Sequence, residues 1–126
     1  MLQDHPIYAY LPARDLARAR TFYEETLGFS SGKENAGGIT YTFGNGSAAF
    51  LYSTPNAGTS KASQAFWSVT DVKSEVAALK ARGVTFEHYG MPGEDADGIV
   101  TGRGAMAAWF RDSEGNILAL IQSMGD

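Results

Sequence analysis

Hydrophobic residues recur at two different periods along the chain, and each period predicts a type of element. The run 7–11 is apolar and aromatic, which predicts a short strand ended by the proline that follows it. The next apolar residues have helical spacing, with Asp15 as the expected N-cap and Gly28 as the expected C-cap. Alternating residues at 40–43 and 48–52 flank a Gly-Asn-Gly turn, so they predict a hairpin.

The same order of elements starts again after a polar stretch. A strand is predicted at 65–69, followed by a helix with Asp71 as its cap and Gly83 at its end. A strand at 84–88 and a hairpin built from 107–111 and 117–122 complete this second half. The two caps, Asp15 and Asp71, lie 56 positions apart, so the pattern indicates a duplicated unit.

We therefore predict an α+β fold that forms one domain over residues 1–126. It would contain two tandem βαβββ modules, at about 5–53 and about 64–123, joined by a linker at 54–63. One module cannot bury its sheet face alone. Two modules can form a curved, mostly antiparallel sheet with helices on its outer face, which leaves a concave cup where a small ligand can bind.

Composition and charge exclude several function classes. The chain has a formal net charge of −4, and its ten Lys and Arg are scattered, so nucleic acid and anionic membranes are poor partners. Cysteine is absent, which excludes disulfides and thiol nucleophiles. No apolar run approaches the length of a membrane span, and the first residues lack the pattern of a signal peptide. We expect a cytoplasmic protein.

Three segments carry a family resemblance: ARDLARARTFYEETLGF at 13–29, SVTDVKSEVAALKARGV at 68–84 and WFRDSEGNILAL at 109–120. Together they resemble the vicinal oxygen chelate superfamily, which includes glyoxalase I, extradiol dioxygenases and bleomycin-resistance proteins. The resemblance implies the cup described above. It leaves the chemistry open, because one fold hosts many unrelated functions.

Metal-dependent members of that superfamily place four ligands on the inner face of the cup. By this resemblance the four positions fall at Tyr8, Leu51, Gln64 and Ala119. None is His, Asp or Glu, and a shift of one residue to Phe50, Tyr52, Leu118 or Leu120 gives nothing better. Divalent metals need several such ligands that converge on one point. We therefore expect a metal-free member without a cofactor and without an assigned catalytic residue.

Strand alternation predicts which side chains line the cup. Small residues at 107 and 119 beside large rings leave room for a flat, partly aromatic or cationic ligand. Trp67 and Phe110 should instead face the helices. The glycine-rich loop 90–104 would cover the ligand. Its carboxylates, Glu94, Asp95 and Asp97, would either pair with a cation or be exposed to solvent. The expected ligand-binding residues are Tyr8, Tyr10, Leu51, Gln64, Phe66, His88, Met91, Trp109 and Ala119.

The leading interpretation is a small-molecule-binding protein of the bleomycin-resistance type. The alternatives are a glyoxalase-like lyase or isomerase or a dioxygenase-type enzyme, and a structural or regulatory subunit without a ligand. His88 is either a polar contact in the pocket or an exposed strand end. The resemblance also implies a homodimer in which each cup combines residues of both chains.

Overall fold

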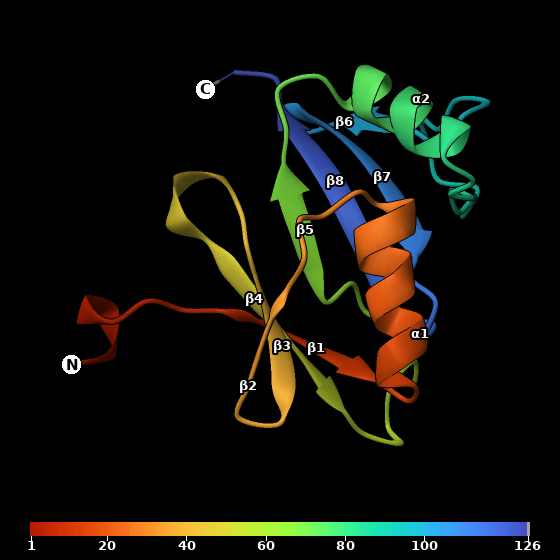
Figure 1. Ribbon diagram of the computed structural model, residues 1–126. Helices are drawn as coiled ribbons and strands as arrows, with labels where there is room; N and C mark the ends of the chain where they lie inside the picture. The colour runs from red at the N-terminus through yellow and green to blue at the C-terminus, as the bar shows by residue number, and fades with distance from the viewer. Residues whose placement is uncertain (126) are drawn as a thin grey trace.

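The computed structural model describes residues 1–125 and contains two helices and eight strands in that range (Figure 1). The first module consists of β1 (Ala9–Ala13), α1 (Leu16–Thr21), a π-helical turn (Phe22–Thr26), β2 (Lys33–Asn35), β3 (Gly38–Thr42) and β4 (Ala48–Ser53). The second consists of β5 (Ala65–Ser68), α2 (Val72–Ala81), β6 (Val100–Gly102), β7 (Ala105–Arg111) and β8 (Ile117–Ser123). Short 3-10 turns lie at Leu2–Asp4 and Gly44–Gly46.

Each module forms a four-stranded sheet of its own. Sheet A has the order β1-β4-β3-β2, and sheet B has the order β5-β8-β7-β6. The pairs β1–β4 and β5–β8 are parallel, whereas the remaining pairs are antiparallel. The predicted α+β fold of two tandem βαβββ modules is confirmed. Within the described residues, β1 and β5 each end a sheet and have a hydrogen-bonded neighbour on one side.

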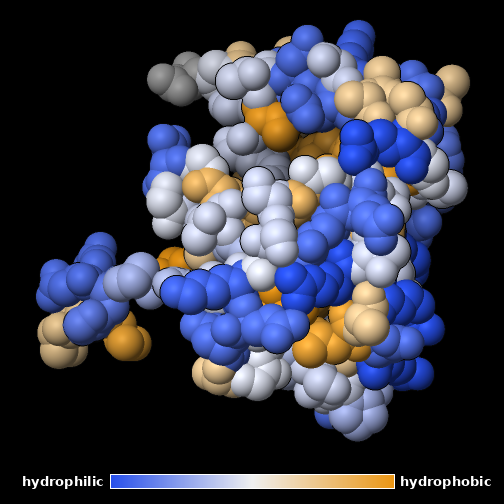
Figure 2. Space-filling model, in the orientation of Figure 1, coloured by the Kyte–Doolittle hydropathy of each residue, from blue (hydrophilic) through white to orange (hydrophobic). Residues whose placement is uncertain are grey.

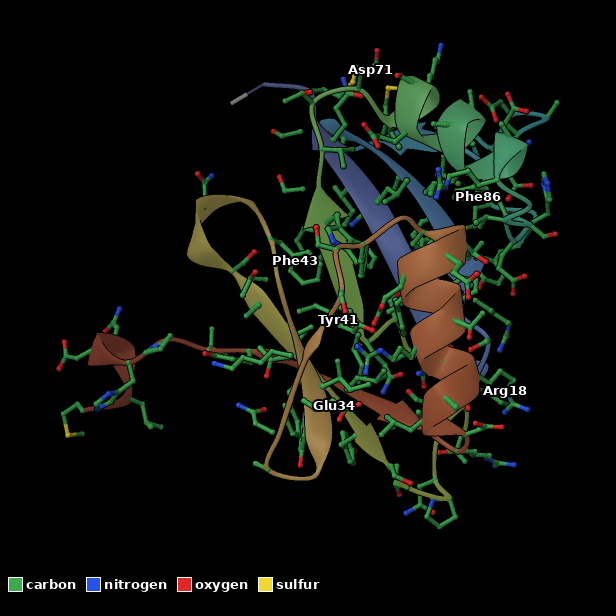
Figure 3. The ribbon with its side chains drawn as sticks, in the orientation of Figure 1. Arg18, Glu34, Tyr41, Phe43, Asp71 and Phe86 are labelled. Carbon is green, nitrogen blue, oxygen red and sulfur yellow. The ribbon has the colours of Figure 1, made fainter. Side chains whose placement is uncertain are left out.

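Local chemistry explains where both helices begin and end. The carboxylates of Asp15 and Asp71 accept the backbone N–H groups of Arg18 and Ser74 at 3.0 and 3.1 Å, as expected for N-caps. Figure 3 labels Asp71 at the start of α2. Gly83 follows α2 with a φ of +95°, a conformation that glycine adopts at little cost. The predicted helix caps are therefore confirmed.

Two strand predictions needed correction. The strand predicted at 7–11 lies at Ala9–Ala13, so Pro12 is inside it. An edge strand tolerates proline because the missing N–H faces no neighbouring strand. The strand predicted at 84–88 is reduced to one bridge between Phe86 and Phe110. In return, β6 lies inside the predicted loop 90–104, and a bridge joins Glu94 to Val100.

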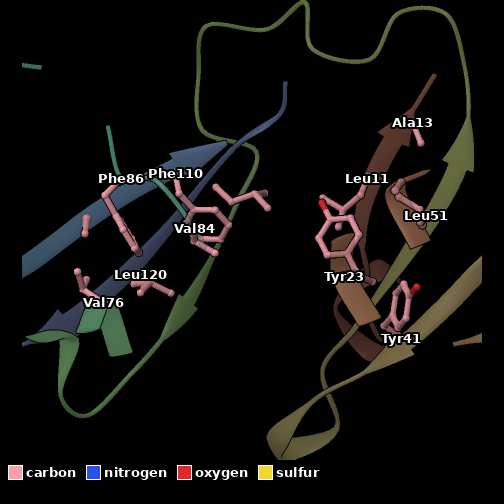
Figure 4. Packing of buried hydrophobic residues seen from close by; sticks show 14 of the residues in the cluster. Leu11, Ala13, Tyr23, Tyr41, Leu51, Val76, Val84, Phe86, Phe110 and Leu120 are labelled. Carbon is pink, nitrogen blue, oxygen red and sulfur yellow. The ribbon is translucent and has the colours of Figure 1, made fainter. Parts of the chain in front are cut away.

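Both sheets bury one face against the same hydrophobic core. Leu11 and Leu51 approach it from sheet A, Tyr23 approaches it from the π-helical turn, and Phe110 and Leu120 approach it from sheet B (Figure 4). Aromatic contacts cross between the modules, with Trp67 lying 5.9 Å from Phe29 and 6.0 Å from Phe43. Trp67 and Phe110 therefore face the core, as predicted. The opposite faces of the two sheets are turned away from this shared core.

The β7–β8 turn ties the second module to the start of α1. The buried carboxylate of Glu114 accepts the backbone N–H groups of Arg14 and Asp15, both at 2.9 Å, and the Nε–H of Arg18 at 2.8 Å (Figure 3). The Tyr23 hydroxyl donates to a carboxylate oxygen of Asp112. We call the interacting side chains Arg18, Tyr23, Asp112, Glu114 and Asn116 the intermodule network.

The segment that connects the modules, residues 54–63, also binds to the intermodule network. The backbone N–H of Gly58 donates to Asn116 Oδ1 at 3.2 Å, and the Asn116 Nδ2 donates to the Pro12 carbonyl at 2.8 Å. A Cβ at Gly58 would overlap the carbonyl oxygen of Glu114, and its φ of +76° also requires glycine. The polar stretch between the modules is therefore docked on the turn.

Candidate functional site

A hollow of about 280 Å³ lies on the face of sheet B that points away from the core. Four residues that were predicted to bind a ligand meet there. Phe66 comes from β5, Trp109 from β7 and Ala119 from β8, and Gln64 directly precedes β5. The lining consists of Ser63, Gln64, Ala65, Phe66, Trp109, Ala119 and Ile121. Sequence reasoning did not include Ser63, Ala65 and Ile121, although Ile121 follows Ala119 by two positions and so lies on the same face.

The centre of this hollow is a slot between two aromatic residues. Phe66 and Trp109 are both directly opposite Ala119 in the sheet register. Neighbouring strands lie about 4.8 Å apart, so the two outer strands of this row are roughly 9.6 Å apart. The methyl group of Ala119 fills little of that distance. Ala119 is 2% exposed and forms the covered floor of the hollow, so a flat ligand ring would contact mainly Phe66 and Trp109.

Tyr89 extends the aromatic wall beyond Trp109. Its ring lies edge-on to the Trp109 ring at a centroid distance of 5.9 Å. The segment is placed there by the Glu87 N–H, which donates to the Trp109 carbonyl at 2.8 Å. Arg111 on the same strand donates to the Glu87 carboxylate at 2.8 Å. Sequence reasoning missed Tyr89 because the segment 84–88 is irregular, so strand alternation could not predict on which face of the sheet the Tyr89 side chain lies.

His88 is exposed and is not among the residues that line the hollow. Its Nδ1 is 3.1 Å from Oε2 of Glu94, and the other oxygen of Glu94 accepts the N–H of Tyr89 at 3.0 Å. Burial opposes ionisation of Glu94, but the bonds from His88 and the backbone outweigh it and lower its pKa. Of the two interpretations of His88, the structure favours the exposed one. Met91, in the same loop, is 40% exposed.

The outward face of sheet A carries a second group of aromatic rings. Tyr10 stacks on Tyr52 at 4.0 Å and lies 6.0 Å from Phe50. Tyr10 and Tyr8 are 63% and 50% exposed. Both tyrosines are therefore exposed, and Tyr10 belongs to this group of rings. Within one chain this surface and the slot on sheet B do not meet, because both face away from the shared core.

The placement of Leu51 on the ligand face is wrong. Leu51 pairs with Leu11 in the register and is fully buried in the core. Side chains alternate along β4, so Leu51 faces the core and its two neighbours face outward. Phe50 and Tyr52 hold the outward positions at this level.

The ligand set that a metal-dependent relative would need does not fit these residues. On the outward faces, the predicted positions offer Tyr8, Gln64 and Ala119, and Phe50 or Tyr52 in place of Leu51. Across residues 1–125, no group of three or more His, Cys, Asp and Glu side chains is arranged to hold a metal ion. We derive no chemical step through a metal.

A larger cleft, of about 520 Å³, lies between the edge strands β1 and β5. Small side chains such as Ala9, Ala49 and Ala65 line it, together with the ring of Trp67. Ile7, which continues β1 toward the N-terminus, is 92% exposed beside it. This cleft separates the two edge strands and leaves both without a second neighbour. In the part of the chain that the structure describes, no helix is long and apolar enough to cross a membrane.

The family model of the Glyoxalase/Bleomycin resistance protein/Dioxygenase superfamily matches residues 3–120. The chain belongs to this superfamily. Superfamily membership confirms the resemblance described for the sequence and agrees with the two βαβββ modules. No curated protein matches the chain.

Solved structures share the fold across nearly the whole chain. One is TnmS3, an antibiotic binding protein from Streptomyces sp. CB03234, with 23% identity, a TM-score of 0.72 and 98% of each chain covered. Another is a glyoxalase/bleomycin resistance protein/dioxygenase from Alicyclobacillus acidocaldarius, with 20% identity, a TM-score of 0.70 and coverage of 98% of this chain and 94% of that one. The oxidase ChaP-H2 is 20% identical, with a TM-score of 0.69, and covers 96% and 98%. At this identity the likeness shows the fold alone.

Proposed function

We propose that this superfamily member binds a flat, partly aromatic or cationic organic molecule without a metal. The observation that carries the proposal is the slot on sheet B, where Phe66 and Trp109 flank Ala119 in one row. Gln64 supplies a directional hydrogen bond at the edge of the same hollow. A small number of polar groups on an apolar, concave lining is typical of small-molecule sites.

The comparisons support a binding role and keep one alternative open. TnmS3, which has the same fold, is described as an antibiotic binding protein. ChaP-H2, which also has the fold, is described as an oxidase. An enzyme of the glyoxalase or dioxygenase type remains the second candidate, but the residues at the expected ligand positions offer no metal set.

A homodimer would complete the site. The aromatic surface of Tyr10, Phe50 and Tyr52 and the slot on sheet B face outward in opposite directions. The edge strands β1 and β5 each have a free hydrogen-bonding side, so β1 of one copy can pair with β5 of another. Such pairing would place the three rings of one protomer beside the slot of its partner. We propose this arrangement and a cytoplasmic location for the protein.

Ala119→Phe is expected to abolish ligand binding, because the added ring occupies the slot. The probes are two fused-ring aromatics, the cation 9-aminoacridine and the anion 8-anilinonaphthalene-1-sulfonate, measured by fluorescence titration. Ala119 is only 2% exposed, so we expect at least a tenfold loss of affinity together with a loss of about 1–3 kcal/mol in the free energy of unfolding. Ala77→Phe, at an exposed position on α2, is the matched control. Equal affinity of both variants and the wild type would place the site elsewhere.

Purification in the presence of Ni, Zn, Mn and Fe(II) is expected to yield protein with less than about 0.1 metal per chain, because the ligand positions lack the His and carboxylate groups that these ions prefer. Elemental analysis measures the metal directly. A content close to one metal per chain would contradict the metal-free proposal and favour the enzyme. His88, Glu94 and Glu87 would then be the first residues to replace.

A further inference from the structure

A second hollow lies on the opposite side of sheet B from the slot, between the end of the first helical segment and α2. Its volume is about 150 Å³. Figure 2 shows hydrophobic surface in this hollow beside α2, bordered by hydrophilic groups. The walls include Leu27 and Phe29 from the first module and Trp67, Val69, Leu79 and Phe110 from the second. We call it the helix groove.

One carboxylate interrupts this apolar lining. Glu75 lies one helical turn before Leu79 on α2, so both side chains are on the same side of the helix. Among residues 1–125 the Glu75 side chain has no ion pair and no hydrogen bond. Glu24 and Glu114, which also border the first helix, are both paired with arginine. A negative charge at the end of an apolar groove is complementary to an amphiphilic cation.

A clamp between the modules holds the two helical segments that border the helix groove. The guanidinium of Arg82 donates to the carbonyls of Thr26 and Glu25 at 2.6 and 3.1 Å. These bonds fix the end of α2 relative to the end of the first helical segment. Of the residues that line the groove, Glu75 is the one with a charged side chain, so the lining favours a cation.

The size of the groove limits the ligand. A dry cavity of about 150 Å³ lined by Leu, Ile and Phe is large enough to admit benzene. The rings of Phe29, Trp67 and Phe110 provide apolar contact, and an ammonium group near the face of an indole gains a further cation–π attraction. One six-membered ring with a short aminoalkyl arm matches both the volume and the charge.

We propose that the helix groove is a second binding site, specific for a small protonated amine that carries one hydrocarbon ring. The ring lies against Trp67 and Leu79, and the ammonium group pairs with Glu75. The site is separate from the slot on sheet B, which faces the opposite way. It therefore does not depend on the proposed function of that slot.

The test uses Trp67 as the reporter. The chain has two tryptophans, so Trp109→Phe leaves Trp67 as the single tryptophan reporter. The probes are cyclohexylmethylamine, cyclohexylmethanol and cyclohexanecarboxylate, which do not absorb where tryptophan is excited. We expect a saturable change in Trp67 emission that is strongest for the amine and absent for the carboxylate.

Two further variants in this background identify the contacts. Glu75→Gln should weaken binding of the amine about three- to fivefold, as for a partly exposed ion pair, and leave binding of the alcohol unchanged. Glu34→Gln, which removes an exposed carboxylate on β2, should change neither. Leu79→Phe should fill the groove and eliminate the response to both probes, while the circular dichroism spectrum stays that of the folded protein.

Three outcomes would overturn the proposal. The first is no saturable change with any of the three probes. The second is equal affinity for amine, alcohol and carboxylate with no effect of Glu75→Gln. The third is a response that appears only after the protein has been diluted until its oligomer dissociates. Such a result would show that a second copy of the chain covers the groove in the oligomer.

Discussion

Glu114→Gln is expected to lower the free energy of unfolding at pH 7 by about 3 kcal/mol, because the buried Glu114 carboxylate accepts several N–H groups that a glutamine cannot all satisfy. The Glu114 side chain is fully buried and accepts the N–H groups of Arg14 and Asp15 as well as two bonds from Arg18. A glutamine has one acceptor oxygen and presents an NH₂ group to the remaining donors. Urea unfolding followed by tryptophan fluorescence measures the difference.

The same carboxylate gives the protein a specific acid sensitivity. Burial alone would raise the pKa of Glu114, but the bonds from Arg18, the Asp15 N–H and Ser113 outweigh it and lower the pKa from 4.5 to about 2. Because the folded-state pKa is lowered, this group stabilises the fold above pH 4.5, and its contribution is lost as the pH falls toward 2. A shift of this size corresponds to about 3 kcal/mol.

Unfolding curves at pH 7, 4.5, 3 and 2 separate this contribution from general acid effects. The Glu114→Gln protein should lose about 3 kcal/mol less than the wild type between pH 4.5 and pH 2. Glu34→Gln is the control. The Glu34 side chain is 75% exposed, so its ion pair with Arg20 should contribute less than about 1 kcal/mol to the free energy of unfolding. Parallel pH profiles of wild type and Glu114→Gln would refute the assignment.

Phe110→Ala is expected to destabilise the fold by about 3–5 kcal/mol, which is a large part of the stability of a small domain. The Phe110 ring is fully buried and lies 6.2 Å from Trp67 and 5.6 Å from Phe86. Its removal opens a cavity at the contact between the modules. Thermal and urea unfolding of the purified variant measure the loss.

Phe66→Ala is the matched control for this prediction. Phe66 belongs to the same sheet, but it points outward and is 59% exposed. Its truncation should cost less than about 1 kcal/mol, because little of its surface leaves water on folding. Similar losses for the two variants would show that the assignment of the two faces of sheet B is incorrect.

Sequence pattern alone predicted most of the fold because its signals are local. The caps Asp15 and Asp71 and the glycines after the helices act through neighbouring backbone groups. The strand at 84–88 failed for the opposite reason. Val84 and Phe86 are buried and alternate like strand residues, but their burial comes from packing on the core, and only Phe86 forms a bridge to the sheet.

The candidate site was predicted in part, and its errors have physical causes. Gln64, Phe66, Trp109 and Ala119 come together because alternation along a well-paired strand fixes the face of each side chain. Leu51 was placed on the wrong face because an error of one residue along a strand moves each side chain to the opposite face of the sheet. The separation of the two outward faces depends on how the modules pack. That packing rests on contacts between distant segments such as Tyr23 and Asp112, which no local pattern reveals.

The intermodule network couples the unfolding of one module to that of the other. Bonds from Glu114 and Asn116 reach α1, β1 and the connecting segment at once, so neither module can lose its structure without breaking contacts of the other. The duplicated halves then behave as one cooperative unit despite their separate sheets. Amide hydrogen exchange at the centre of β4 and at the centre of β8 should therefore report the same opening free energy, equal to that of global unfolding.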